Sequence, residues 1–419
     1  MPSSNPAISV HLARTFLVPG HSVEGEVELN FQELQQDNIQ EVHVKLRGVV
    51  RTVITINTTT DIKTVRLVRD DASVWSQGGA YPSPGSNTLR IPFRFLLPPD
   101  LPPSFHYSRY GRKGAIRYAV TAVGTRPSTF SLNRRVHAPL AIIPKDTPDG
   151  VALREKLALM AATGADCEWR TERKEEKMRR GLWGDYATAQ VELQIPKVSA
   201  CPLYVPIPFV IKIRTISAPL ARAKADAHPA DHPVFPPVPA SYSEIQFKLH
   251  DKLFIKATSL KEKVPADVVQ FKPHTEPDAV LAEDVPARKW VPLGGTDEKK
   301  SGEVDPHTKG TWIQEATFRS TFRLDCPPTF ALDTLTCDYD LALKVPFPGV
   351  GNDISLSMPI VITSGMDVPV MRDQPNASGA PLDLPPCVLS YVTQQLIYED
   401  SRRSYWDAGD KEWDDDIKD

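Results

Sequence analysis

The chain has 419 residues with 49 basic and 52 acidic side chains, which gives a formal net charge of −3. This length predicts two domains, and the near-neutral charge argues against a nucleic-acid-binding protein. Forty prolines are nearly twice the usual share of about 5%. Because proline breaks helix interiors, a mostly helical protein is not expected.

Cysteine usage and the apolar segments indicate the compartment. The five cysteines, at positions 167, 201, 326, 337 and 387, are scattered and form no CxxC pair. This pattern predicts neither a disulfide framework nor a zinc site and fits a reducing cytosol. Residues 1–6 hold no apolar signal core, the C-terminus offers no prenylation cysteine, and prolines break the longest apolar stretch, 201–211. We therefore expect a cytoplasmic protein with at most peripheral membrane association.

The first part of the chain alternates apolar and polar residues with a period of two. Val42, Val44 and Leu46 alternate with polar residues, and the same period recurs over 89–95 and 116–122. Such alternation is typical of strands with one buried face. The sequence predicts an antiparallel β-sandwich over residues 7–145.

Residues 146–185 differ in character. Residues 151–162 favour a short helix that Gly164 could end. The highly charged run 168–180 mixes both signs, and we interpret it as a solvated helical face, with binding of acidic lipid or nucleic acid as the alternative. We expect a charged, partly helical linker here.

The alternation returns further on. It recurs over 205–213, 245–249, 318–324, 339–345 and 354–362. These strands predict a second sandwich over 186–365, interrupted by mobile loop insertions at 217–243 and 285–310. Residues 366–419 are expected to be a disordered acidic tail. The predicted fold class is all-β: two tandem antiparallel, immunoglobulin-like β-sandwiches joined by a short helical linker.

Charge is distributed unevenly along the chain. Residues 1–145 hold 17 basic and 10 acidic side chains, net +7, whereas 366–419 hold 5 and 12, net −7. Opposite charges attract, although salt screens exposed pairs. We therefore hypothesise that Asp407–Asp419 docks on the basic front and competes with acidic ligands.

Signatures of catalysis and metal binding are weak. The sequence contains no GxGxxG, GxxxxGK, GxSxG or HExxH motif. His228 and His232 have a spacing that a helix could use for a metal, but a proline follows each histidine. We expect no catalytic residue, cofactor or metal. A β-sandwich hydrolase stays open as an alternative, because the separation of paired carboxylates is a property of the folded chain.

One cluster of basic residues is a candidate binding site. Arg109, Arg112, Lys113 and Arg117 lead into the strand 116–122. Such a cluster on a sandwich could hold an acidic or phosphorylated peptide through charge-assisted hydrogen bonds. Ordinary surface charge is the other interpretation, and the sequence does not choose between them.

Two groups of motifs resemble a known family. Phe93-Arg-Phe95 is followed by Leu101-Pro-Pro-Ser-Phe105 and then Gly114-Ala-Ile116-Arg-Tyr118, an arrangement that resembles the N-terminal domain of arrestins, especially fungal α-arrestins. Phe322–Phe330 and Cys337–Val345 resemble the arrestin C-terminal domain more weakly. The resemblance implies a non-catalytic adaptor that binds membrane-protein cargo tails and links them to endocytic or endosomal trafficking, at the plasma membrane or endosomes. A retromer-type arrestin-fold scaffold is the alternative within this class.

The resemblance also implies a link to HECT-type ubiquitin ligases, which α-arrestins recruit through PPxY motifs. No Pro-Pro pair in this chain continues as PPxY. The nearest accessible segment is expected around Pro236, Pro239 and Tyr242, where a PxxP could suit an SH3 or WW groove. A solvated spacer that binds nothing is the other interpretation of this segment.

Overall fold

The computed structural model describes residues 6–127, 133–146, 148–164, 167–179, 181, 184–228, 232–264, 268–273, 279–293 and 307–364. The expected acidic tail, with its segment 407–419, lies outside the described residues. No helix in these ranges is long and apolar enough to cross a membrane.

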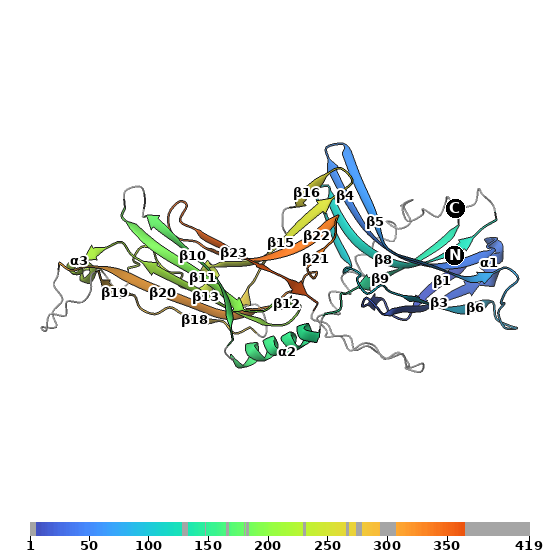
Figure 1. The fold of residues 1–419 in the computed structure, drawn as a ribbon, viewed down its shortest axis with the longest axis horizontal. Helices are drawn as coiled ribbons and strands as arrows, with labels where there is room; N and C mark the ends of the chain where they lie inside the picture. The colour runs from blue at the N-terminus through green and yellow to red at the C-terminus, as the bar shows by residue number, and fades with distance from the viewer. Residues whose placement is uncertain are drawn as a thin grey trace, which may run out of the picture.

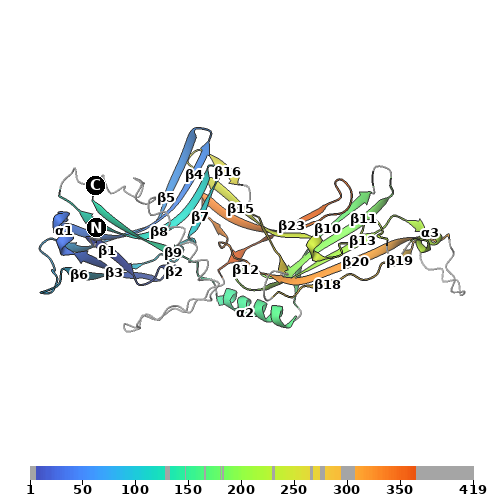
Figure 2. The same cartoon turned by 180° about the vertical axis from the view of Figure 1, so that it is seen from behind.

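Two β-sandwiches lie end to end along the long axis of the molecule (Figures 1 and 2). In the first, a three-stranded sheet of order β1-β3-β6 faces a sheet of order β2-β9-β8-β4-β5, to which β7 adds by pairing with β8. Its elements are β1 Ile8–Leu12, β2 Phe16–Leu17, β3 Ser22–Asn30, α1 Phe31–Gln36, β4 Glu41–Ile56, β5 Thr59–Ser76, β6 Thr88–Leu96, β7 Phe105–Arg109, β8 Arg112–Thr125 and β9 Arg134–Ile142. These elements form the first of the two antiparallel sandwiches that the predicted fold class contains.

The second sandwich is built in the same way. One sheet has the order β10-β11-β13-β20-β14, with β18 and β19 also pairing β20, and the other has the order β16-β15-β22-β21, with β17 and β23 attached. A short parallel pair, β12 with β24, lies beside them. The elements are α2 Pro148–Thr163, β10 Trp169–Arg179, β11 Tyr186–Pro196, β12 Cys201–Pro202, β13 Ile207–Ile216, β14 Leu220–Ala221, α3 Arg222–Asp226, a 3-10 turn Tyr242–Glu244, β15 Gln246–Lys256, β16 Lys261–Val264, β17 Val268–Gln270, β18 Ala282–Asp284, β19 Lys289–Pro292, β20 Lys309–Phe322, β21 Phe330–Ala331, β22 Leu335–Val345, β23 Ile354–Ile360 and β24 Ile362–Thr363.

The core follows the period-two pattern of the sequence. Leu46 on β4 and Tyr118 on β8 are fully buried, and Phe93 and Phe95 of the facing sheet lie 7% and 4% exposed. The rings of Phe93 and Phe95 are 5.9 Å apart between centroids. The Tyr118 hydroxyl donates a hydrogen bond to the Pro102 carbonyl at 2.8 Å, so the one polar atom of this buried ring is satisfied.

The charged run 168–180 is not helical, so that prediction was wrong. It forms the edge strand β10, paired along its whole length with β11. Charged side chains on an edge strand discourage pairing with other chains, which explains a strand with little apolar character. Arg170 and Lys174 donate to the carbonyls of Pro359 and Ser355 on β23, and these bonds link the edges of the two sheets. The run thus belongs to the second sandwich and not to a linker.

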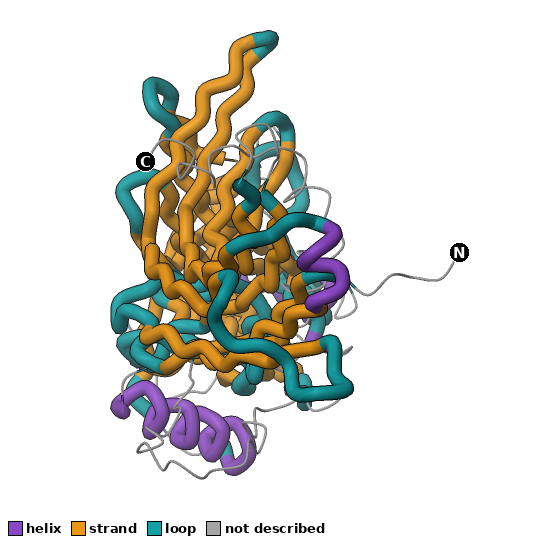
Figure 3. Tube along the Cα trace, turned by 90° about the vertical axis from the view of Figure 1, so that its right-hand side faces the viewer, coloured by secondary structure: helices purple, strands orange, loops and turns teal. Residues whose placement is uncertain are grey.

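The other insertions are also more ordered than expected. The helix predicted at 151–162 is α2, which runs beside the second sandwich (Figures 1 and 3). Gly164, at φ +66°, ends it, and its N–H donates to the Met160 carbonyl at 2.9 Å. The predicted loop 217–243 contains β14 and α3, and the predicted loop 285–310 contains β19. Within these loops, residues 229–231 and 294–306 lie outside the described residues.

The long strands of the first sandwich reach the second domain. Beyond its own sandwich, the inner face of β4 and β8 packs on the other domain. The Thr52 hydroxyl, fully buried, donates to the Lys256 carbonyl at 2.7 Å, and a side chain at Gly114 would meet Leu335 at 2.7 Å. The rings of Phe105 and Phe330 meet edge to face, 5.0 Å apart.

Hydrogen bonds near the tip of the β4–β5 hairpin and an ion pair at the β7–β8 turn complete this domain interface. Asp61 accepts hydrogen bonds from the N–H groups of Ser259 and Leu260, at 2.7 and 2.8 Å, and from the Ser259 hydroxyl at 2.8 Å. The backbone bonds hold the pKa of Asp61 below its ordinary value. Arg112 forms a two-bonded ion pair with Glu262, in which Nη2 donates to Oε1 at 3.0 Å. Hydrogen bonding from Arg112 lowers the pKa of Glu262.

The packing predicts unequal effects at neighbouring positions of β6. Replacing Phe93 with Ala should lower the free energy of unfolding by about 3–5 kcal/mol, because a large core side chain leaves a cavity. Arg94→Ala should cost less than about 1 kcal/mol, since Arg94 is exposed and contacts Ser22 and Glu24 at the surface. A urea titration of both variants makes the comparison, and equal losses would contradict the assigned strand face.

The interface predicts that the ionised side chains of Asp61 and Glu262 hold the two domains in place at neutral pH. Since the pKa values of Asp61 and Glu262 are lowered in the folded protein, their contribution is complete above the ordinary carboxyl pKa and is lost as pH falls through the lowered values. The double variant Asp61→Ala and Glu262→Ala should therefore broaden the distribution of interdomain distances at neutral pH, measured by small-angle X-ray scattering. Glu315→Ala with Asp353→Ala, which removes two ion pairs inside the second domain, is the control. Scattering curves identical to the parent for the interface variant would rule the arrangement out.

Candidate functional site

Strand alternation separates the four predicted basic residues. Arg109 and Arg112 flank the tight β7–β8 turn and are cross-strand neighbours. Arg112 points toward the second domain, where Glu262 binds it. Lys113 and Arg117 lie on the opposite, outer face of the same sheet. The structure therefore places Lys113 and Arg117 on one face of the sheet, where Lys113 is exposed and Arg117 is only 7% exposed, and uses Arg112 in the domain interface.

The outer face of this sheet carries a dense array of cations. Cross-strand pairing places Lys45 beside Asp71 and Thr121, Arg47 beside Arg69, and Arg117 beside Val49. Arg51, Arg66, Lys113 and Arg135 occupy the same face by the same register. We call these residues the basic face: Lys45, Arg47, Arg51, Arg66, Arg69, Lys113, Arg117 and Arg135. Among the described residues of this face, the carboxylates are Glu41 and Asp71.

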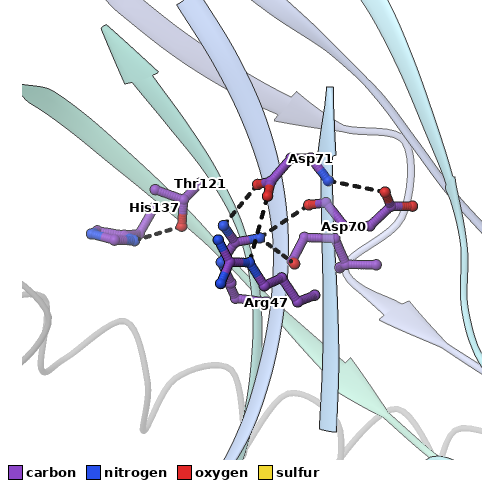
Figure 4. A network of polar contacts seen from close by, with 7 residues as sticks. Arg47, Asp70, Asp71, Thr121 and His137 are labelled. Carbon is purple, nitrogen blue, oxygen red and sulfur yellow. Dashed lines mark hydrogen bonds and ion pairs between the residues drawn. The ribbon is translucent and has the colours of Figure 1, made fainter. Parts of the chain in front are cut away.

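Asp71 organises the centre of the basic face (Figure 4). Arg47, only 9% exposed, donates from Nη2 to Asp71 Oδ1 at 2.7 Å and from Nη1 to the carbonyls of Leu46 and Asp70 at 3.0 and 3.1 Å. Arg69 approaches the other oxygen of Asp71, with 3.7 Å between Nε and Oδ2. Arg47 and Arg69 lie directly opposite each other, so the shared carboxylate offsets a repulsion that would otherwise destabilise the strand pair.

Two histidines extend the basic face. His137 Nδ1 lies 2.9 Å from the Thr121 hydroxyl (Figure 4), and His43 Nε2 lies 3.2 Å from Glu41 Oε2. Both rings are partly exposed.

Most of the basic face was missed from the sequence. The alternation of Val42, Val44 and Leu46 with His43, Lys45 and Arg47 was visible, and cations continue with the same period to Arg51. The partners on β5 were not predictable, because two bulges shift its register against β4. A count of charges by strand face would have found the β4 and β8 members.

The structure does not support the predicted proline-rich ligand. Pro236, Pro239 and Tyr242 are all buried. Tyr242 is 2% exposed, packs against Phe209 and Phe318, and donates from its hydroxyl to the Phe271 carbonyl at 3.2 Å. An SH3 or WW groove needs these side chains at the surface, whereas the structure buries them in the second domain.

No group of three or more His, Cys, Asp or Glu side chains that could hold a metal occurs within the described ranges. Of the two histidines with metal-type spacing, His232 offers its carbonyl to Arg288 Nη1 at 2.6 Å, and His228 Nδ1 lies 3.5 Å from Nη2 of the same arginine. Arg288 also stacks on Trp312, 4.7 Å from the ring centre. A guanidinium beside the imidazole disfavours a cation at this place.

Residues 11–146 match the family of the arrestin (or S-antigen) N-terminal domain. The match supports the arrestin family. It spans nearly all of the first sandwich, including every residue of the basic face. No curated protein matches the chain. Proteins of the arrestin family are generally non-catalytic adaptors, and the likeness of the second sandwich to an arrestin C-terminal domain stays a prediction.

Proposed function

We propose that this arrestin-like protein is an adaptor of the fungal α-arrestin type, which binds acidic or phosphorylated tails of membrane-protein cargo on the basic face. The observation that carries the proposal is the gathering of eight cations on one face of a single sheet, with Asp71 as the carboxylate at its centre. Delivery of that cargo to endocytic or endosomal sorting is the role that the arrestin likeness favours.

The basic face supplies many donors within reach of one ligand, because side chains directly opposite on neighbouring strands are about 5 Å apart. An anionic ligand on this face gains charge-assisted hydrogen bonds, which are about twice as strong as neutral ones. Arginine supplies most of these groups, and its planar fork suits carboxylate and phosphate oxygens.

The sheet also suits an extended ligand. The strands β4, β5 and β8 give a rigid platform, on which cations recur at every second residue along β4 from Lys45 to Arg47 and again at Arg51. Binding sites on regular strands are more exact in position than sites on loops. We propose that the protein works in the cytoplasm and reaches the plasma membrane or endosomes through its cargo.

Any link to a ubiquitin ligase needs a route other than PPxY. The sequence lacks this motif, and the nearest substitute is buried in the second domain. We propose that, if the protein promotes ubiquitination, it recruits the HECT-type ligase through folded-domain contacts or through another adaptor.

Neutralising exposed members of the basic face should weaken anion binding. The triple variant Arg66→Gln, Arg69→Gln and Lys113→Gln should lower the affinity for a doubly phosphorylated cargo-tail peptide at least tenfold, measured by fluorescence anisotropy at low salt. The affinity of the parent should fall with added salt, because screening acts on exposed charges. The control variant Lys197→Gln, Arg214→Gln and Lys344→Gln removes the same charge from the second domain. Equal losses in the two variants would show that net charge alone binds the peptide.

Isolated WW domains of HECT ligases should bind the full chain only weakly, at about 100 μM or looser. The reason is that Tyr242 cannot leave its packed position without unfolding part of the second domain. A titration of the purified protein against these domains is the measurement. Low-micromolar binding that disappears in a folded Tyr242→Phe variant would overturn this view, because Phe keeps the packing and removes the hydroxyl that the WW groove reads.

A further inference from the structure

A groove lies between helix α2 and the outer face of the second domain's larger sheet. Its volume is about 570 Å³, within the range of small-molecule sites. The floor is one cross-strand row, in which Gln194, Val210, Arg319 and Ala282 pair in sequence across β11, β13, β20 and β18. The C-terminal end of α2 borders it with Met160, Ala161 and Gly164.

The lining is largely apolar. Met160 and Val210 are each 6% exposed, and Trp169 adds a partly buried indole at one end. Val280, at 81% exposed, extends the apolar surface at the mouth. Apolar walls of this kind hold a hydrocarbon chain by removing its surface from water.

The charged groups that line the groove are both cations. Lys212 and Arg319 lie on neighbouring strands at diagonal positions, which places their side chains roughly 7–8 Å apart at the base. Among the described residues, neither side chain has a hydrogen-bond or ion-pair partner. Two carboxylates lie on the same face: Glu192, directly opposite Lys212, forms an ion pair with Arg173, and Glu315 forms one with Arg214. Asp284 lies one pair further along β18, outside the groove lining.

We propose that this groove is a binding site for a long-chain carboxylate, with the hydrocarbon chain along the apolar floor beneath α2 and the carboxylate between Lys212 and Arg319. A carboxylate has two oxygens, and a guanidinium and an ammonium on neighbouring strands can each satisfy one of them. The site lies in the second domain, so it is independent of the anion binding proposed for the basic face.

The test is calorimetric titration of the full chain with sodium decanoate below its micelle concentration, with decan-1-ol as the uncharged ligand of equal chain length. We expect saturable binding of one decanoate, at least tenfold tighter than decan-1-ol. The variant Lys212→Gln with Arg319→Gln should lose this tenfold preference and change the affinity for decan-1-ol less than twofold. Arg214→Gln, which lies on the same face outside the groove, should behave as the parent.

A second variant tests where the hydrocarbon chain of the ligand lies. Val210→Glu places a carboxylate on the floor of the groove and should lower the affinity for decanoate at least tenfold. A cooperative thermal unfolding curve shows that this variant is folded. Unchanged decanoate binding in both groove variants would overturn the proposal, as would the absence of saturable binding in the parent. Tighter binding of decyl phosphate than of decanoate would overturn the assignment of the head group.

Discussion

The architecture depends on one sheet face that serves two cores. The inner face of β4 and β8 covers the first sandwich at one end, where Leu46 and Tyr118 are buried, and packs on the second domain at the other, where Thr52 and Gly114 lie. The β4–β5 hairpin can extend this far only because the second domain's β15–β16 turn receives it at Asp61. The same strands therefore fix both the first core and the domain arrangement.

The division of the sheet into two faces also explains the basic face. Every residue that points inward on β4 and β8 must be apolar or small, or must satisfy its polar atoms across the domain interface. The outward positions hold the arginines and lysines, with small or apolar residues such as Ala119 and Val49 buried between them. Arg47 shows the limit of this freedom: it is nearly buried and is held by Asp71 and two carbonyl oxygens, because a buried guanidinium must be fully hydrogen-bonded. The stability of the first domain and its capacity to bind anions thus come from opposite faces of one sheet.

Much of the fold could be predicted from local patterns. The alternation placed Phe93 and Phe95 in the core, and Gly164 ended α2 where its positive φ required glycine. Prolines within strands also occupy the expected edges: Pro92 lies in β6 at the end of its sheet, and Pro208 lies where β13 pairs β20 but has not yet reached β11. These features depend on neighbours a few residues away, so the sequence alone contains them.

The failures concern contacts between distant segments. The charged run at 168–180 has a helical composition, but the partner strand β11 makes it a strand. Arg112 looks like a surface cation until Glu262, 150 residues later, reaches it across the interface. Tyr242 looks accessible in a proline-rich loop, yet Phe209 and Phe318 enclose it. In each case the contacting residue is distant in the sequence, so a local sequence pattern does not predict the contact.

The central claim is that anionic cargo binds on the outer face of β4, β5 and β8. Photo-cross-linking of the full chain to a doubly phosphorylated peptide that carries a photoreactive group, followed by mass spectrometry, locates the ligand directly. The account predicts cross-links within residues 43–71 and 113–121, and their loss when an excess of unlabelled phosphopeptide competes. Cross-links concentrated in the second domain, or spread evenly over both domains, would contradict it.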